Sequence, residues 1–158
     1  MTIPKLPIRI IKQGGNLKAT TSVDTLYDNR KSIRQELGYI EQDYGSLVRV
    51  LRELLTSSKS AQKSDPRILW LIGDYLLSFF ERLDSLGFYL VKQNETVARD
   101  ISTSESSIEK ILSFRRRFSF ISLVDSSIPW SQYRENKVPI KQTQGDKNEN
   151  KNVRRRFA

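Results

Sequence analysis

Two stretches of the chain repeat apolar residues at helical spacing, and together they predict a pair of long helices. The first stretch, 23–56, keeps alternating intervals of four and three residues and is interrupted only at Arg30. Its apolar positions are Leu26, Ile33, Leu37, Ile40, Tyr44, Leu47, Leu51 and Leu54. The second, 66–91, has a broader stripe and begins after Asp65-Pro66, a pair typical of a helix start. We expect the two helices to pack antiparallel.

The two apolar stripes are compatible with more than one packing arrangement. They fit the core of this chain, the seam of a coiled-coil homodimer, or a groove for another protein's helices. An apolar seam offers no polar group with which to hold a cofactor.

The segment from Asn94 to Leu112 fits the pattern of a DNA-binding helix-turn-helix. Small and apolar residues recur where the two helices of that motif pack together, at Val97, Ala98, Ile101, Ile108 and Ile111. Ser102 stands where a turn glycine is usual, and Thr103 where a buried apolar residue is usual. Ser104 can cap the second helix, which we expect over 105–118.

The exposed start of that second helix is the predicted contact with DNA bases, and its basic end the predicted contact with phosphates. The base-contacting candidates are Thr103, Glu105, Ser106, Glu109 and Lys110, and the phosphate-contacting candidates are Arg115, Arg116 and Arg117. Two carboxylates on this helix repel phosphates, so a purely structural helical corner is the alternative. The arginines can equally stabilise a helix C-terminus. The nearby Phe114, Phe118 and Phe120 fit core packing better than stacking on single strands.

Positive charge concentrates near the ends of the chain. The 27 Lys and Arg residues outnumber the 18 Asp and Glu residues, which gives a net charge of +9. Residues 1–18 hold four bases and no acid, and residues 138–158 hold six bases, among them Arg154, Arg155 and Arg156, against two acids. We therefore expect two basic flexible tails, 1–19 and 138–158, that contact phosphates or are simply solvated.

Residue composition argues against catalysis. The chain of 158 residues has no Cys and no His, which removes thiolate nucleophiles, most zinc sites and the usual proton carrier near neutral pH. Asp125 with Glu135 and Lys137 matches the spacing of a magnesium-dependent nuclease, but Pro129 and Pro139 in this stretch argue against the strands that such a site needs. We expect no catalytic residues, no metal and no cofactor. The absence of a long apolar run or a secretory signal predicts a cytoplasmic protein without membrane contact.

Three segments in order resemble a known family. They are Ile68 to Gly73, Ala98 to Phe118 with its Arg115-Arg116-Arg117 run, and Trp130-Ser131-Gln132-Tyr133-Arg134. Together they look like the helical N-terminal domain of the nuclease-like proteins of the PD-(D/E)xK type that were long catalogued as a domain of unknown function. The resemblance covers roughly residues 20 to 137. It implies a DNA-associated helical module from a mobile element or defence system, and the family's catalytic domain is expected to be absent because the chain ends where that domain would begin. Gln132 replaces the histidine of the family's motif.

These patterns predict one all-α domain over 20–137, with helices near 23–56, 66–91, 95–101, 105–118 and 129–136. The predicted function is duplex DNA binding by the helix-turn-helix without catalysis. The alternative is an interaction or assembly protein that uses its helix pair to bind itself or a helical partner.

Overall fold

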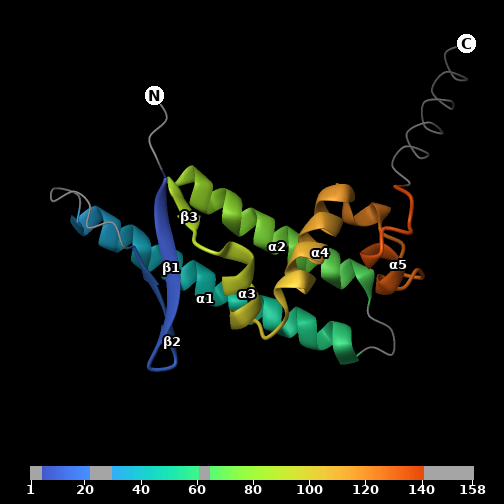
Figure 1. Ribbon diagram of the computed structural model, residues 1–158, viewed down its shortest axis with the longest axis horizontal. Coiled ribbons are helices and arrows are strands. Elements are labelled where there is room, and N and C mark those ends of the chain that lie inside the picture. Colours follow the sequence, from blue (N-terminus) through green and yellow to red (C-terminus); the bar gives the residue numbers. More distant parts are fainter. Residues whose placement is uncertain (1–4, 22–29, 61–64, 141–158) are drawn as a thin grey trace, which may run out of the picture.

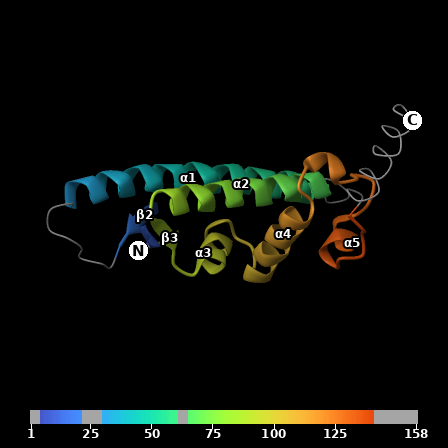
Figure 2. The same cartoon turned by 90° about the horizontal axis from the view of Figure 1, so that it is seen from above.

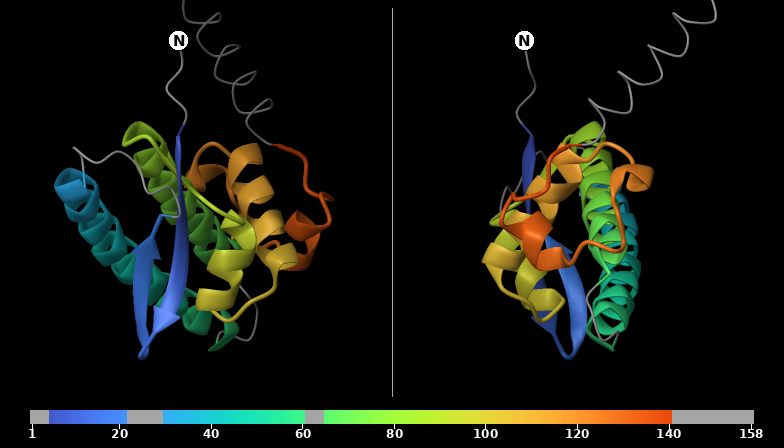
Figure 3. Two further views of the ribbon diagram at one scale, coloured as in Figure 1. Left: turned by 60° about the vertical axis from the view of Figure 1, so that its left-hand side comes forward. Right: turned by 90° about the vertical axis from the view of Figure 1, so that its right-hand side faces the viewer.

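The computed structural model describes residues 5–21, 30–60 and 65–140 and shows a mixed α/β fold in two layers (Figures 1, 2 and 3). The first layer is the pair α1 (Arg30–Ser60) and α2 (Pro66–Ser85). The second holds a three-stranded sheet, α3 (Gln93–Asp100), α4 (Glu105–Arg117) and α5 (Trp130–Arg134). The all-α prediction is therefore wrong, because three strands accompany the helices in the described part of the chain.

The helix pair follows the predicted apolar stripe. Ile40, Tyr44, Leu47 and Leu51 are buried, and the helices run antiparallel as expected (Figure 2). Towards the end of α1 the buried positions shift to Val48 and Leu55, because a straight helix of 3.6 residues per turn drifts away from a seven-residue repeat. Leu26 lies outside the described residues.

The helix α2 begins at the residue that the sequence predicts. Asp65 is its N-cap and accepts a hydrogen bond from the Arg67 amide at 3.0 Å, and Pro66 is the first helical residue. Neither α1 nor α2, nor any shorter helix in the described ranges, combines the length and apolar character needed to cross a bilayer.

Much of the segment expected to be a basic N-terminal tail forms a β-hairpin. Strand β1 (Leu6–Gln13) pairs antiparallel with β2 (Asn16–Thr20), and Gln13 lies opposite Asn16. The two residues between them, Gly14 and Gly15, have φ of 58° and 81°. A two-residue turn with positive φ at both positions matches the twist of paired strands, and glycine adopts that conformation without steric cost.

The third strand lies where the sequence predicts the end of the second long helix. The helix α2 stops at Ser85, and Gly87, with φ of 84°, lets the chain turn into β3 (Phe88–Leu90). Strand β3 pairs parallel with β1, which gives the order β2-β1-β3. Leu86 and Leu90 prolong the apolar repeat of α2, but Leu86 is exposed at the helix end and Leu90 is buried as a strand residue.

Candidate nucleic-acid interface

The chain bends sharply between α3 and α4. Ser102 has φ of 61°, and two hydrogen bonds close the end of α3, from the Thr103 amide to the Ala98 carbonyl and from the Ser102 amide to the Arg99 carbonyl. This pair of bonds is the Schellman arrangement, which usually has glycine where Ser102 stands. Ser104 then caps α4 by accepting a hydrogen bond from the Ser107 amide at 3.1 Å. A helical corner thus forms where the helix-turn-helix pattern places it.

The positions predicted to face inward across this corner are buried. Val97, Ala98 and Ile101 from the α3 side meet Ile108 and Ile111 of α4, and all five are at most 4% exposed. Among the predicted base-contacting residues, Glu105, Ser106, Glu109 and Lys110 are exposed and Thr103 is half-buried. Since α4 packs on α2 through its opposite side, this exposed face points away from the α1–α2 layer (Figure 2).

Replacing Ser102 with glycine is expected to stabilise the protein by roughly 0.5–1 kcal/mol. A side chain in the left-handed region is strained, and glycine removes that strain although it adds freedom to the unfolded chain. Urea unfolding of the variant and the wild type measures the difference. Lys110→Gly is the control: at an exposed position in the middle of α4 it should destabilise by a similar amount. A destabilising Ser102→Gly would contradict the strain at this turn.

Two of the three arginines at the end of α4 form hydrogen bonds with other residues of this chain. The Arg115 Nε atom donates to Asp74 of α2 at 3.0 Å, and its guanidinium lies 4.5 Å from the centre of the Trp70 ring. Arg117 donates to the Asn136 side chain and to the Val138 carbonyl. Arg116 is exposed. The predicted joint grip of all three on phosphate does not match this arrangement, because only Arg116 is free of such contacts.

The motif residues of the family resemblance meet at one junction of α2, α4 and α5. The Trp70 Nε1 atom donates to the Phe118 carbonyl at 2.7 Å. The Phe114 ring has three aromatic neighbours, with centroids 5.0–5.4 Å away in Phe118, Trp130 and Tyr133. These side chains are core, so single-strand stacking by Phe114 and Phe118 is ruled out in this fold, whereas Phe120 is exposed.

A glycine permits the close approach of helices at this junction. A Cβ atom added to Gly73 of α2 would lie 2.7 Å from the Arg115 Cβ atom and 3.2 Å from the Ile111 carbonyl oxygen. Both atoms belong to the body of α4 and cannot move aside easily. Gly73 therefore lets α4 lie directly on α2, and α2 in turn fixes the direction of the helical corner.

The outer face of the sheet is basic and was not foreseen from the sequence. Ile8 and Ile10 point into the core, and strand alternation places Arg9 and Ile11 on the opposite, exposed face. Cross-strand pairing adds Lys18 beside Ile11, and Tyr89 of β3 lies on the same face opposite Pro7. No acidic residue occurs in 5–21 or in β3, although Glu41 of α1 lies beside Lys18 and Glu95 of α3 borders the same pocket as Arg9. The signal that would have revealed this face is Gly14-Gly15 between two short apolar runs.

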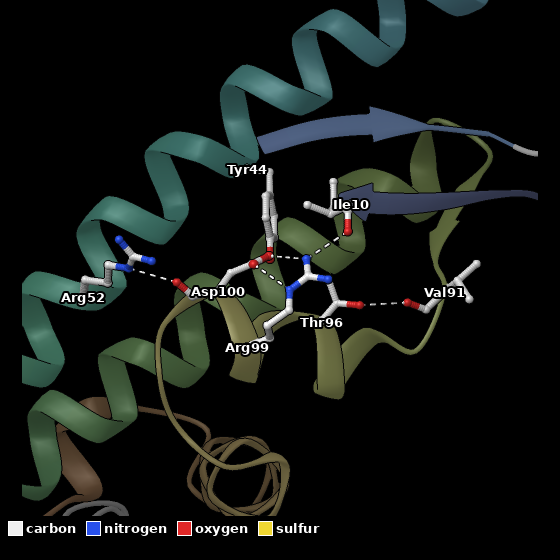
Figure 4. A network of polar contacts seen from close by, with 7 residues as sticks. All are labelled: Ile10, Tyr44, Arg52, Val91, Thr96, Arg99 and Asp100. Atoms are coloured by element: carbon white, nitrogen blue, oxygen red, sulfur yellow. Dashed lines mark hydrogen bonds and ion pairs between the residues drawn. The ribbon is translucent and has the colours of Figure 1, made fainter. Parts of the chain in front are cut away.

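A buried polar network fixes α3 against the helix pair and the sheet (Figure 4). The Asp100 carboxylate is fully buried, accepts a hydrogen bond from the Tyr44 hydroxyl at 2.5 Å, and pairs with Arg99 at 2.9 Å. Arg99 also donates to the Ile10 carbonyl of β1, and Arg52 of α1 donates to the Asp100 carbonyl. Burial, followed by the Asp100 hydrogen bond, raises the pKa of Tyr44, and that same carboxylate raises the pKa of Arg99 through its hydrogen bond. The network is a structural clamp.

The residues with nuclease-like spacing have local roles. The Asp125 carboxylate accepts hydrogen bonds from the amide and hydroxyl of Ser127, and Glu135 pairs with Arg134 at 3.4 Å. Within 5–21, 30–60 and 65–140, no three Asp or Glu side chains gather in a way that could hold a metal ion. The other predicted phosphate contacts, Arg154, Arg155 and Arg156, lie outside the described residues.

Comparisons with protein-family models, with curated proteins and with solved structures find no match to this chain.

Proposed function

We propose that the chain binds duplex DNA without catalysis, through the surface of its second layer. The α3–α4 corner presents the start of α4 to a groove, as the helix-turn-helix pattern predicts. The basic sheet face supplies phosphate contacts, in place of the Arg115 and Arg117 contacts that the sequence suggested.

The observation that carries this proposal is the position of the hairpin. Its strands occupy the same layer as the helical corner, and the face that carries Arg9 and Ile11 is exposed, while Lys18 lies where β2 meets α1 (Figures 1 and 2). Arg9 is exposed, Lys18 is half exposed and reaches Glu41 only at 4.0 Å, and Arg116 lies exposed on α4. Basic side chains without a close acidic partner can neutralise DNA phosphates, and this releases the counterions held by the DNA.

The acids on α4 limit how that helix can be used. Glu105 and Glu109 lie on its exposed face and would repel phosphates, while each can accept a hydrogen bond from a cytosine amine in the major groove. Affinity would then come mainly from the sheet and Arg116, and any sequence preference from the first turns of α4. The origin of the protein in a mobile element or defence system is a further part of the proposal and rests on the family resemblance alone.

A charge-removal variant tests the proposed surface. The triple variant Arg9→Ser, Lys18→Ser and Arg116→Ser should bind a mixed-sequence duplex about 10- to 100-fold more weakly at ~100 mM salt. The slope of log affinity against log salt should become shallower by roughly 3, since each lost phosphate contact removes about 0.9. Fluorescence anisotropy at several salt concentrations gives both quantities.

The matched control removes three bases from the other layer. Arg34→Ser, Arg49→Ser and Arg82→Ser lower the net charge equally and lie on α1 and α2, although Arg82 is paired with Asp43 at 2.9 Å and Arg49 lines the same pocket as Lys18. This control should keep most of the affinity and most of the salt slope. Equal losses in the two triple variants would show that only net charge matters, and no measurable binding by the wild type would reject the function.

The alternative function, assembly through the helix pair, has one observation in its favour. Tyr39 of α1 and Tyr75 of α2 are 63% and 46% exposed on the α1–α2 layer, which gives a helical partner two aromatic side chains to bury.

A further inference from the structure

An open groove runs along the edge of the sheet in the second layer. Its volume is about 480 Å³, and its floor and walls come from α2, β3, the start of α3 and the end of α4. Leu77 and Phe80 are its partly buried apolar lining from α2, and Arg116 of α4 lines it as well. Figure 1 shows the α2 ribbon passing between β3 and α4 along this stretch. The groove is open to solvent and is lined by residues of all three elements.

The strand that borders this groove has a free edge. The Gly87 carbonyl and the Val91 amide bond to Leu6 and Ile8 of β1. Because alternate residues of a strand direct their main-chain groups to opposite edges, the amides and carbonyls of Phe88 and Leu90 face the groove. In the described part of the chain no hydrogen bond is made by these four groups. An edge of this kind is a template for another extended segment.

We propose that this groove is filled by residues 153–157 of the same chain, which pair with β3 as a fourth strand. The residues beyond Ile140 are tethered to the end of α4, which raises their effective concentration at the groove above that of a second copy. An extended segment is thin enough to enter. Its main chain would form hydrogen bonds with the amides and carbonyls of Phe88 and Leu90. One row of its side chains would face Leu77 and Phe80.

The composition of residues 141–158 selects the segment. Val153 and Phe157 are the two large apolar residues beyond Ile140. In an extended chain they share a face with Arg155, because side chains alternate. On that face the Val153 and Phe157 side chains would cover the α2 residues of the groove. The Arg155 guanidinium between them would pair with the Glu81 carboxylate, which also lines the groove. Leu77 and Phe80 supply the complementary apolar surface.

The chain leaves the described structure beside the end of α4, the helix whose Arg116 lines the groove. Arg117 donates to the Val138 carbonyl at 3.2 Å, so the last described residues lie against the end of α4, one residue from Arg116. The 13 steps from Ile140 to Val153 can span roughly 40 Å when extended. That reach is about twice the length of α4, which has 13 residues and is roughly 20 Å long.

Amide exchange in the full chain tests the pairing, with substitutions only in residues 153–157. In the wild type the Phe88 and Leu90 amides should exchange at least about 10-fold more slowly than in the double variant Val153→Ser and Phe157→Ser. The control Asn148→Ser and Asn152→Ser should match the wild type, and the Tyr89 and Val91 amides should not change in any variant. Equal exchange of Phe88 and Leu90 in all three proteins would overturn the proposal.

A spin label gives a second, positive measurement. The chain has no cysteine, so Ala158→Cys provides one labelling site for a nitroxide. We expect paramagnetic broadening of the Phe80 and Tyr89 amides that disappears in the Val153→Ser and Phe157→Ser background. No broadening in the parent would overturn the proposal. Broadening that appears only as protein concentration rises tenfold would overturn it in favour of exchange between two copies.

Discussion

Replacing Phe114 with alanine is expected to lower the free energy of unfolding by about 4 kcal/mol. The side chain is 2% exposed and its ring contacts those of Phe118, Trp130 and Tyr133, so its removal leaves a large cavity at the junction of α4 and α5. Loss of the aromatic contacts adds to the loss of burial. Urea unfolding followed by tryptophan fluorescence measures the effect.

Two further variants keep this prediction testable even if Phe114→Ala does not fold. Phe114→Leu fills part of the cavity and should cost roughly 1.5 kcal/mol, which leaves a folded protein for measurement. Phe120→Ala removes a phenylalanine that is 61% exposed and should change stability by less than about 0.5 kcal/mol. Similar losses at Phe114 and Phe120 would contradict the assignment of Phe114 to the core.

The helices were predictable because their signals are local. The apolar stripe of α1, the Asp65-Pro66 start of α2 and the Ser104 cap of α4 each depend on residues within a few positions of one another. The bend at Ser102 was predictable for the same reason. The Schellman bonds that form it join residues three and five positions apart.

The sheet was missed because its signals are short or distant. In β1 the alternation is blurred by adjacent Ile10 and Ile11, one buried and one 41% exposed. Strand β3 has three residues and follows α2 without a break in the apolar repeat. Its partner in β1 lies about 80 positions earlier in the chain, and no local pattern encodes such a pairing.

The arginine run shows what helical geometry could have revealed from the sequence. Successive residues of a helix point about 100° apart, so three consecutive side chains cannot share one face. Arg115 accordingly turns to Asp74 on α2, Arg117 to the segment near Val138, and Arg116 to solvent. A phosphate grip by one helix requires bases spaced by three or four residues instead.

Replacing Asp100 with alanine is expected to cost about 3 kcal/mol or more. The change leaves the Tyr44 hydroxyl buried without a partner and removes the charged acceptor of Arg99. Arg99 is 46% exposed and can turn to water, so we count little for its charge. Urea unfolding at pH 8 measures the loss, and Tyr75→Phe, on the exposed side of α2, is the control and should stay within about 0.5 kcal/mol.

The pH dependence of stability reports on the hydrogen bond from Tyr44 to Asp100, because the packing of the Tyr44 ring does not depend on pH. Because the pKa of Tyr44 is raised in the folded protein, the folded state keeps the hydroxyl proton where the unfolded chain loses it. Stability from this group is complete below the ordinary tyrosine pKa of about 10 and falls as pH rises above it. Tyr44→Phe should remove that part of the alkaline loss, which urea unfolding at pH 8 and pH 11 can measure. An unchanged alkaline loss in Tyr44→Phe, together with full stability in Asp100→Ala, would mean that Tyr44 and Asp100 do not hold α1 and α3 together.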